Sequence, residues 1–367
     1  MKRERIKYLE NIIPDILNRC EIPGLSFGII HKDELVYSAG FGKASISSNK
    51  KIDNNTVYSL GSLTKSFTAC GAVLLDQRNI INLDLPIINY YKSLVLKDED
   101  LAKKITFIDL LTHRTGYPRN DQFWAFSTKS RLELINDLKN LDTTQELRSS
   151  FIYNNHMYML AGFLIELIEN KTWEKFILDN FLLPLNMCST GNLNLLKNID
   201  NYASAHQFKD GKLIEFNEFG FGACAPAGSL VSNISDLSKW ISLFIQKGEF
   251  EGQKILSNSS YQKIFKPYIK SHSKTFSNFK EFDQEFYGLG WRIQKFKNEN
   301  IFWHGGGTEG FTSFMGIIPE KNYGIIVLAN SIKQSIDKDG ASIVACYLLD
   351  LILSSEFDNW DRKFSDM

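Results

Sequence analysis

Short apolar segments at both ends of the chain predict β-strands. Near the N-terminus, residues 25–31 and 34–39 are two such segments separated by Lys32-Asp33, which is typical of neighbouring strands joined by a tight turn. Strand-like segments return only late in the chain, at 288–294, 301–304, 312–318 and 324–329. We therefore expect the N- and C-terminal parts to contribute to one antiparallel sheet.

Between these segments, apolar residues recur every three to four positions, which predicts helices. This spacing covers 67–75, 108–111, 131–138, 158–168, 173–180 and 234–246. An amphipathic helix is expected from Ile6 to Leu17 and a terminal helix over 341–353. The pattern predicts an α+β protein in which a sheet built from both chain ends is flanked by helices and carries an inserted, mostly helical lobe.

The same pattern predicts how the lobes divide the sequence. We expect a single domain over 1–367, with a sheet lobe made of 1–60 plus 285–367 and a helical lobe made of 61–284. An active site in such a protein would lie at the seam between the lobes.

Composition and charge exclude several functions. Lys and Arg number 42, as do Asp and Glu, so no net charge would attract nucleic acid or an anionic membrane. The five cysteines are scattered without metal-ligand spacing, which favours free thiols in a reducing compartment and no metal or other cofactor. No segment has the pattern of a signal peptide or a transmembrane span, so we expect a cytoplasmic protein.

A serine and a lysine three residues apart, Ser62 and Lys65, open the long apolar helix predicted over 67–75. Residues i and i+3 share one helix face, so Lys65 would lie beside the Ser62 hydroxyl. Burial disfavours the charged form of a lysine, and a neutral amine can act as a general base that activates a serine. The alternative is a helix-capping serine followed by a lysine whose ammonium reaches solvent.

Two later segments are further candidates. Tyr153 and Asn155 precede the predicted helix 158–168, where Tyr153 could relay a proton and Asn155 could contact a substrate carbonyl; the alternative is a packing tyrosine with an asparagine cap. His304 and the glycines up to Gly307 follow a strand, where glycines allow close approach of the backbone to a ligand; the alternative is a flexible turn.

Taken together, these segments resemble the serine β-lactamase-like superfamily, in particular the class C branch of penicillin-binding-protein-related serine hydrolases. The three motifs of that family are Ser-x-x-Lys, Tyr-x-Asn and Lys/His-x-Gly, and all three occur here in that order. Further segments that resemble the family are 22–25, 83–86, 105–118, 184–187, 226–230, 236–237 and 287–291. The resemblance implies a β-lactamase/transpeptidase-like fold.

The resemblance also implies a role for each motif residue. Ser62 would be the acylated nucleophile, with Lys65 and Tyr153 as the acid/base pair. Asn155, His304 and Gly306 would bind substrate. The backbone N–H groups of Ser62 and Gly307 would form the oxyanion hole.

His304 stands where β-lactamases and DD-peptidases usually carry lysine. A histidine is mostly neutral at pH 7, whereas a lysine suits the carboxylate of a penicillin or a peptide. We therefore expect a serine hydrolase acting through an acyl-enzyme on a small ester, amide or short peptide. The alternatives are a DD-carboxypeptidase or β-lactamase and, in another class, a catalytically silent binding or scaffold protein.

Overall fold

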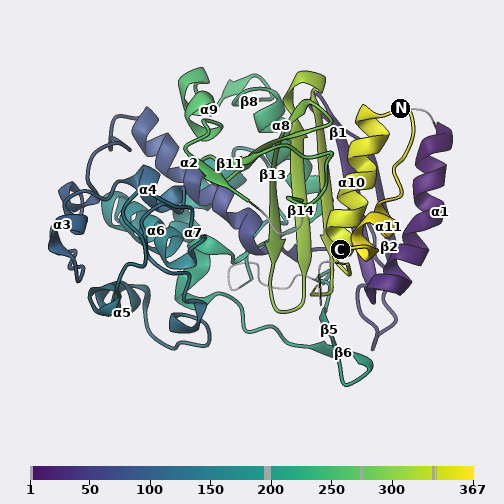
Figure 1. Cartoon of the computed structure of the whole chain (residues 1–367), viewed down its shortest axis with the longest axis horizontal. Helices are drawn as coiled ribbons and strands as arrows, with labels where there is room; N and C mark the ends of the chain where they lie inside the picture. Colours follow the sequence, from purple (N-terminus) through teal and green to yellow (C-terminus); the bar gives the residue numbers. More distant parts are fainter. Residues whose placement is uncertain (1–2, 194–199, 273–275, 333–334, 336) are drawn as a thin grey trace.

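An eight-stranded antiparallel sheet forms the centre of the protein in this computed structural model, which describes residues 3–193, 200–272, 276–332, 335 and 337–367. The strand order is β10-β11-β12-β13-β14-β15-β1-β2. N-terminal β1 pairs with β15 along its whole length, so the two chain ends share one sheet (Figure 1). The expected α+β architecture is confirmed. The strands are β1 Gly24–His31, β2 Glu34–Gly42, β10 Ile269–Ser271, β11 Glu285–Tyr287, β12 Arg292–Phe296, β13 Glu299–Gly307, β14 Thr312–Ile318 and β15 Tyr323–Ala329.

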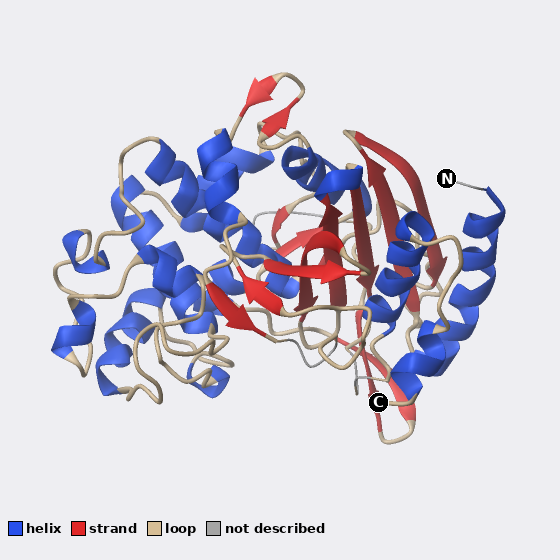
Figure 2. Cartoon of the chain, turned by 45° about the horizontal axis from the view of Figure 1, so that its top comes forward, coloured by secondary structure: helices blue, strands red, loops and turns tan. Residues whose placement is uncertain are grey.

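Helices cover both faces of this sheet (Figure 2). In β15, Ile325 and Val327 pack toward α1, α10 and α11, whereas Ile326 and Leu328 pack toward α8 and the helical lobe. Alternate residues of a strand point to opposite faces, so a strand buried on both sides is a continuous apolar segment. The covering helices are α1 Arg3–Cys20, α8 Ile234–Ile245, α10 Gly340–Leu353 and α11 Trp360–Ser365.

Helix α2, Thr64–Gln77, lies beside the sheet among the helices of the middle part of the chain (Figure 1). Every residue from Thr64 to Leu75 is buried. It packs against α6, α7 and α9, so the start of α2 is held at the seam between the sheet and the helical lobe. The other helices of this lobe are α3 Glu99–Ala102, α4 Phe107–Leu111, α5 Arg131–Asn136, α6 Asn155–Glu169, α7 Trp173–Ile177 and α9 Asn258–Ile264.

The structure differs from the sequence-based expectation in several elements. The strand expected at 288–294 is a turn followed by β12, because Gly290 adopts φ +77° and a Cβ there would lie 2.8 Å from the Lys65 carbonyl oxygen. Strand β10 joins the sheet from within 61–284. Short strands that no pattern predicted are β3 Tyr58–Ser59, β4 Gly191–Asn192, β5 Ala205–Lys209, β6 Lys212–Phe216, β7 Leu230–Ser232, β8 Glu249–Phe250 and β9 Gln253–Lys254. In the described part of the chain, no helix is long and apolar enough to cross a membrane.

Candidate active site

Ser62 and Lys65 lie together at the start of α2. Ser62 belongs to a short 3-10 turn, Gly61–Leu63, that leads directly into the helix. The Lys65 Nζ atom donates a hydrogen bond to the Ser62 Oγ atom at 3.1 Å. Lys65 is fully buried, whereas Ser62 is half-buried. The structure therefore brings together an accessible hydroxyl and an amine that has lost its contact with water.

Two further acceptors surround the lysine amine. Its Nζ atom donates to Asn155 Oδ1 and to the backbone oxygen of Ala227, both at 2.7 Å. The same atom lies 4.8 Å from the centroid of the Tyr153 ring. No hydrogen bond connects it to the Tyr153 hydroxyl in the described structure. The site thus draws on α2, the start of α6 and the segment before β7.

The backbone of β13 approaches the nucleophile turn closely. A Cβ on Gly61, which has φ +52°, would lie 2.7 Å from the Gly307 nitrogen. A Cβ on Gly306 would lie 2.1 Å from the Leu60 oxygen and 2.2 Å from Ser313 Oγ. Gly306 is therefore required for packing of β13 against the turn, while Gly307 is exposed beside Ser62.

The His304 ring lies behind this strand end and is 1% exposed. Its Nδ1–H donates to the Gly305 oxygen at 2.7 Å, and its Nε2 accepts from the Tyr287 hydroxyl at 2.9 Å. Burial, together with the positive charges of Arg292 and Lys65, lowers the pKa of His304 well below its usual value. The ring is therefore neutral at pH 7, with both nitrogens already occupied.

His113, a residue to which the motifs assigned no role, supports the Tyr153 segment. It adopts φ +58°, and its Nδ1 accepts the backbone N–H of Asn154 at 3.0 Å. Its ring lies 4.3 Å from the Tyr153 ring, centroid to centroid. Burial and neighbouring cations, Lys65 first, lower its pKa well below the usual value. A conformation that is uncommon for a non-glycine residue could not be inferred from the sequence.

Asp121 is a second residue that sequence reasoning missed. Its Oδ1 accepts from Asn155 Nδ2 at 2.9 Å and from Trp124 Nε1 at 3.0 Å. Its Oδ2 accepts from Arg119 Nε at 2.6 Å. Asp121 therefore fixes the Asn155 amide, because Oδ1 must face Lys65 while Nδ2 faces the carboxylate. An isolated aspartate in a loop carries no sequence signal of this role.

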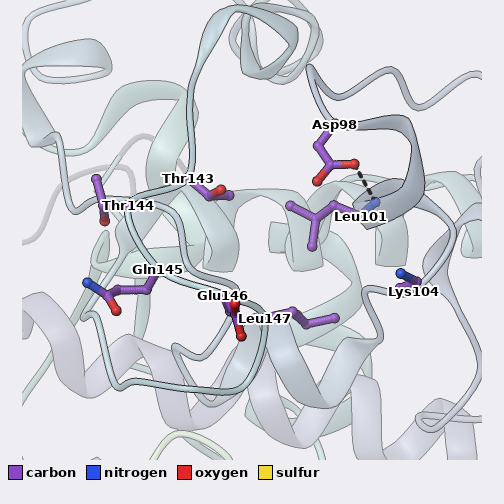
Figure 3. Close-up of a pocket in the computed structure, with 8 residues that line it drawn as sticks. All are labelled: Asp98, Leu101, Lys104, Thr143, Thr144, Gln145, Glu146 and Leu147. Carbon is purple, nitrogen blue, oxygen red and sulfur yellow. Dashed lines mark hydrogen bonds between the residues drawn. The ribbon is translucent and has the colours of Figure 1, made fainter.

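A surface hollow elsewhere in the helical lobe, with a volume of about 490 Å³, contains none of these groups (Figure 3). Figure 3 shows it between the start of α3 and the segment 143–147. Its lining residues are Asp98, Leu101, Lys104, Thr143, Thr144, Gln145, Glu146 and Leu147. Within the described ranges, no group of three or more His, Cys, Asp or Glu residues is placed to hold a metal ion.

Comparison with known proteins identifies the family. A beta-lactamase family model matches residues 9–345, so the chain belongs to the beta-lactamase family. The octameric penicillin-binding protein homologue from Pyrococcus abyssi has a similar structure, with a TM-score of 0.82 and 27% identity over 95% of this chain and 77% of that one. The expected superfamily and the expected β-lactamase/transpeptidase-like fold are thereby confirmed.

Two curated relatives also match most of this sequence. An unguisins hydrolase, ungD', from Aspergillus campestris is 26% identical over 97% of this chain. Protein flp from Staphylococcus aureus is 25% identical over 90% of this chain. The matches span 67% and 64% of those proteins, so the chain accounts for about two thirds of the length of each.

The glycine pair at the end of β13 gives a test of the packing. We expect Gly306→Ala to lower the free energy of unfolding by about 2 kcal/mol, the usual cost of overpacking, because its Cβ would overlap the Leu60 oxygen and Ser313 Oγ. Gly307→Ala is the matched control, since a Cβ there meets nothing within 4 Å. Chemical denaturation measures the free energy of unfolding of both variants. Equal stability of the two variants would contradict the close approach.

Proposed function

We propose that this protein is a serine hydrolase of the beta-lactamase family that cleaves a small ester or amide through an acyl-enzyme. The observation that carries the proposal is the hydrogen bond between the buried Lys65 Nζ and the half-exposed Ser62 Oγ. In this proposal the Lys65 amine accepts the proton of the Ser62 hydroxyl, the role of a general base that activates a serine. The name of one relative, an unguisins hydrolase, agrees with hydrolysis as the reaction class.

In the proposed reaction, Lys65 Nζ as a neutral amine keeps its two hydrogens on Asn155 Oδ1 and the Ala227 oxygen. Its lone pair takes the proton of the Ser62 hydroxyl as Ser62 Oγ attacks the substrate carbonyl. The backbone N–H groups of Ser62 and Gly307 stabilise the resulting oxyanion. Tyr153, whose ring faces Lys65, donates a proton to the leaving alcohol or amine as the carbonyl re-forms. Lys65 then passes the proton it took from Ser62 to Tyr153, which restores the pair. Water attacks the acyl-enzyme carbonyl, the Lys65 and Tyr153 pair accepts a proton from the water and passes it to Ser62 Oγ, and the carboxylic acid is released.

The neutral His304 favours substrates without a carboxylate at this position. A lysine would supply a permanent cation for the carboxylate of a penicillin, whereas His304 is uncharged and bonded to Tyr287 and Gly305. Esters and amides are therefore preferred over β-lactams in this proposal. A catalytically silent binding protein is disfavoured, because such a protein gains nothing from a buried lysine beside a serine.

Removing the Ser62 hydroxyl tests the proposal directly. We expect Ser62→Ala to abolish hydrolysis of p-nitrophenyl esters and covalent labelling by a fluorophosphonate, with no change in thermal unfolding. For the wild type, ester hydrolysis should clearly exceed nitrocefin hydrolysis. Labelling is followed by intact mass and turnover by absorbance. Undiminished ester turnover in Ser62→Ala would reject Ser62 as the nucleophile, and an equal nitrocefin rate would favour a β-lactamase.

Lys65→Arg tests whether the lysine acts as a base. Arginine keeps the positive charge and donor groups but remains protonated, so it cannot accept the serine proton. We expect kcat to fall about 100-fold or more, the usual contribution of a general base. Tyr153→Phe should also lose activity while keeping the ring that packs against His113. Near-normal turnover of Lys65→Arg would make Lys65 an electrostatic anchor instead.

Asp121 should act as a positioning residue through Asn155. Asp121→Ala removes the acceptor that orients the amide, and we expect kcat/KM to fall about tenfold, equivalent to about 1.4 kcal/mol. Asn155→Ala should lower kcat/KM by at least the same factor. In the double variant, the loss should be smaller than the two single losses combined, because both act on one hydrogen-bonded unit. Fully additive losses in this double-mutant cycle would contradict coupling through the Asn155 amide.

A further inference from the structure

Two loop segments that are far apart in sequence meet through pairs of aromatic rings. Trp124 stacks on Phe221 with ring centroids 5.2 Å apart and an interplanar angle of 15°. Phe126 packs edge-to-face against Phe219 at the same centroid distance with an angle of 81°. We call these four residues the aromatic clasp.

The outer pair of the clasp is strongly exposed. Phe126 is 72% exposed and Phe219 is 76% exposed, although both are large apolar rings. Edge-to-face contact between two aromatic rings is favourable, so this pair can hold the two loops together. Core packing, the ordinary role of a phenylalanine, does not account for rings that remain mostly in water.

The inner pair is connected to the proposed catalytic groups. Trp124 Nε1 donates to the same Asp121 Oδ1 atom that accepts from Asn155 Nδ2. The Phe221 ring packs on Gly228, where a Cβ would lie 2.2 Å from it. The residue before Gly228 is Ala227, whose backbone oxygen accepts from Lys65. Trp124 is therefore linked to Asn155 through Asp121, and the Phe221 ring packs one residue away from Ala227; both Asn155 and Ala227 accept from Lys65.

The outer pair is tied to the opposite wall of the site. The backbone N–H of Phe219 donates to Glu309 Oε2 at 2.9 Å. Glu309 follows Gly307, the proposed oxyanion donor, by two residues. The segment from Phe219 to Phe221 thus connects the region after β13 with the segment that leads to Gly228.

We propose that the aromatic clasp is a binding surface for a phenyl-sized apolar group on the acyl part of the substrate. This inference rests on the proposed function and narrows its substrate class to esters or amides of aryl or bulky alkyl carboxylic acids. We place the group on the acyl side because Trp124 is hydrogen-bonded to Asp121, which in turn binds Asn155, the residue proposed to contact a substrate carbonyl. An apolar group placed between exposed rings removes apolar surface of both partners from water.

The test compares p-nitrophenyl acetate with p-nitrophenyl phenylacetate, which share one leaving group. The wild type should favour the phenylacetate in kcat/KM by about tenfold, within the range for apolar groups that enter a fitted pocket. Phe126→Ala and Phe219→Ala should each reduce this preference at least about threefold. Phe126→Tyr should retain it, because the ring remains. Leu183→Ala, which truncates a 63% exposed leucine elsewhere, should leave both rates and their ratio unchanged.

A binding measurement keeps this test separate from the test of the proposed function. In the Ser62→Ala protein, phenylacetamide should bind at least about tenfold more tightly than acetamide, and Phe219→Ala in that background should remove the difference. Two results would overturn the clasp proposal and leave the proposed hydrolase intact. One is Ser62-dependent ester turnover without a preference for the phenyl substrate, and the other is a preference that neither Phe126→Ala nor Phe219→Ala reduces. A preference seen only for benzyl over methyl in the alcohol part would also overturn the acyl-side assignment. If the wild type showed neither fluorophosphonate labelling nor ester turnover but still bound phenylacetamide, the proposed hydrolase activity would be rejected and the apolar binding site would stand.

Discussion

The buried amine of Lys65 determines which segments of the chain meet at the centre of this structure. Lys65 is completely buried, and a buried amine is tolerated only when its polar hydrogens have acceptors. Those acceptors come from the turn before α2, from the first residue of α6 and from the segment before β7. Three parts of the chain, separated by up to 162 residues, must therefore converge on a single nitrogen atom.

A second constraint links the sheet to this cluster. Gly306 and Gly61 permit contacts between backbones that any side chain would block, and Ser313 Oγ donates to the Leu60 oxygen at 2.8 Å across the same junction. The end of β13 is thereby fixed against the nucleophile turn. Because Ser62 belongs to the turn before α2 and Gly307 to the end of β13, their relative position depends on this glycine-mediated contact.

The spacing of apolar residues predicted the helices and strands that face a core. Features that depend on local conformation or on tertiary contacts were not predicted. The β14 segment 312–318 was predicted with its observed bounds, because its apolar residues supply both faces of a buried strand. The motifs located Ser62, Lys65 and Asn155, whose side chains do meet. Asp121 and His113 were missed, since a loop aspartate and a positive-φ histidine act through tertiary contacts. Two-residue strands such as β3 lack enough positions to show a period.

The charge balance behind β13 explains why position 304 carries a histidine. Arg292 is paired with the buried Glu285, and Lys65 has only neutral acceptors. A lysine at the position of His304, which is 1% exposed, would bury a further cation close to Arg292. A neutral imidazole instead accepts the Tyr287 hydroxyl and donates to Gly305, which satisfies both nitrogens without charge. The uncharged ring of His304 at the end of β13 is thus the feature that supports the proposed preference for substrates without a carboxylate.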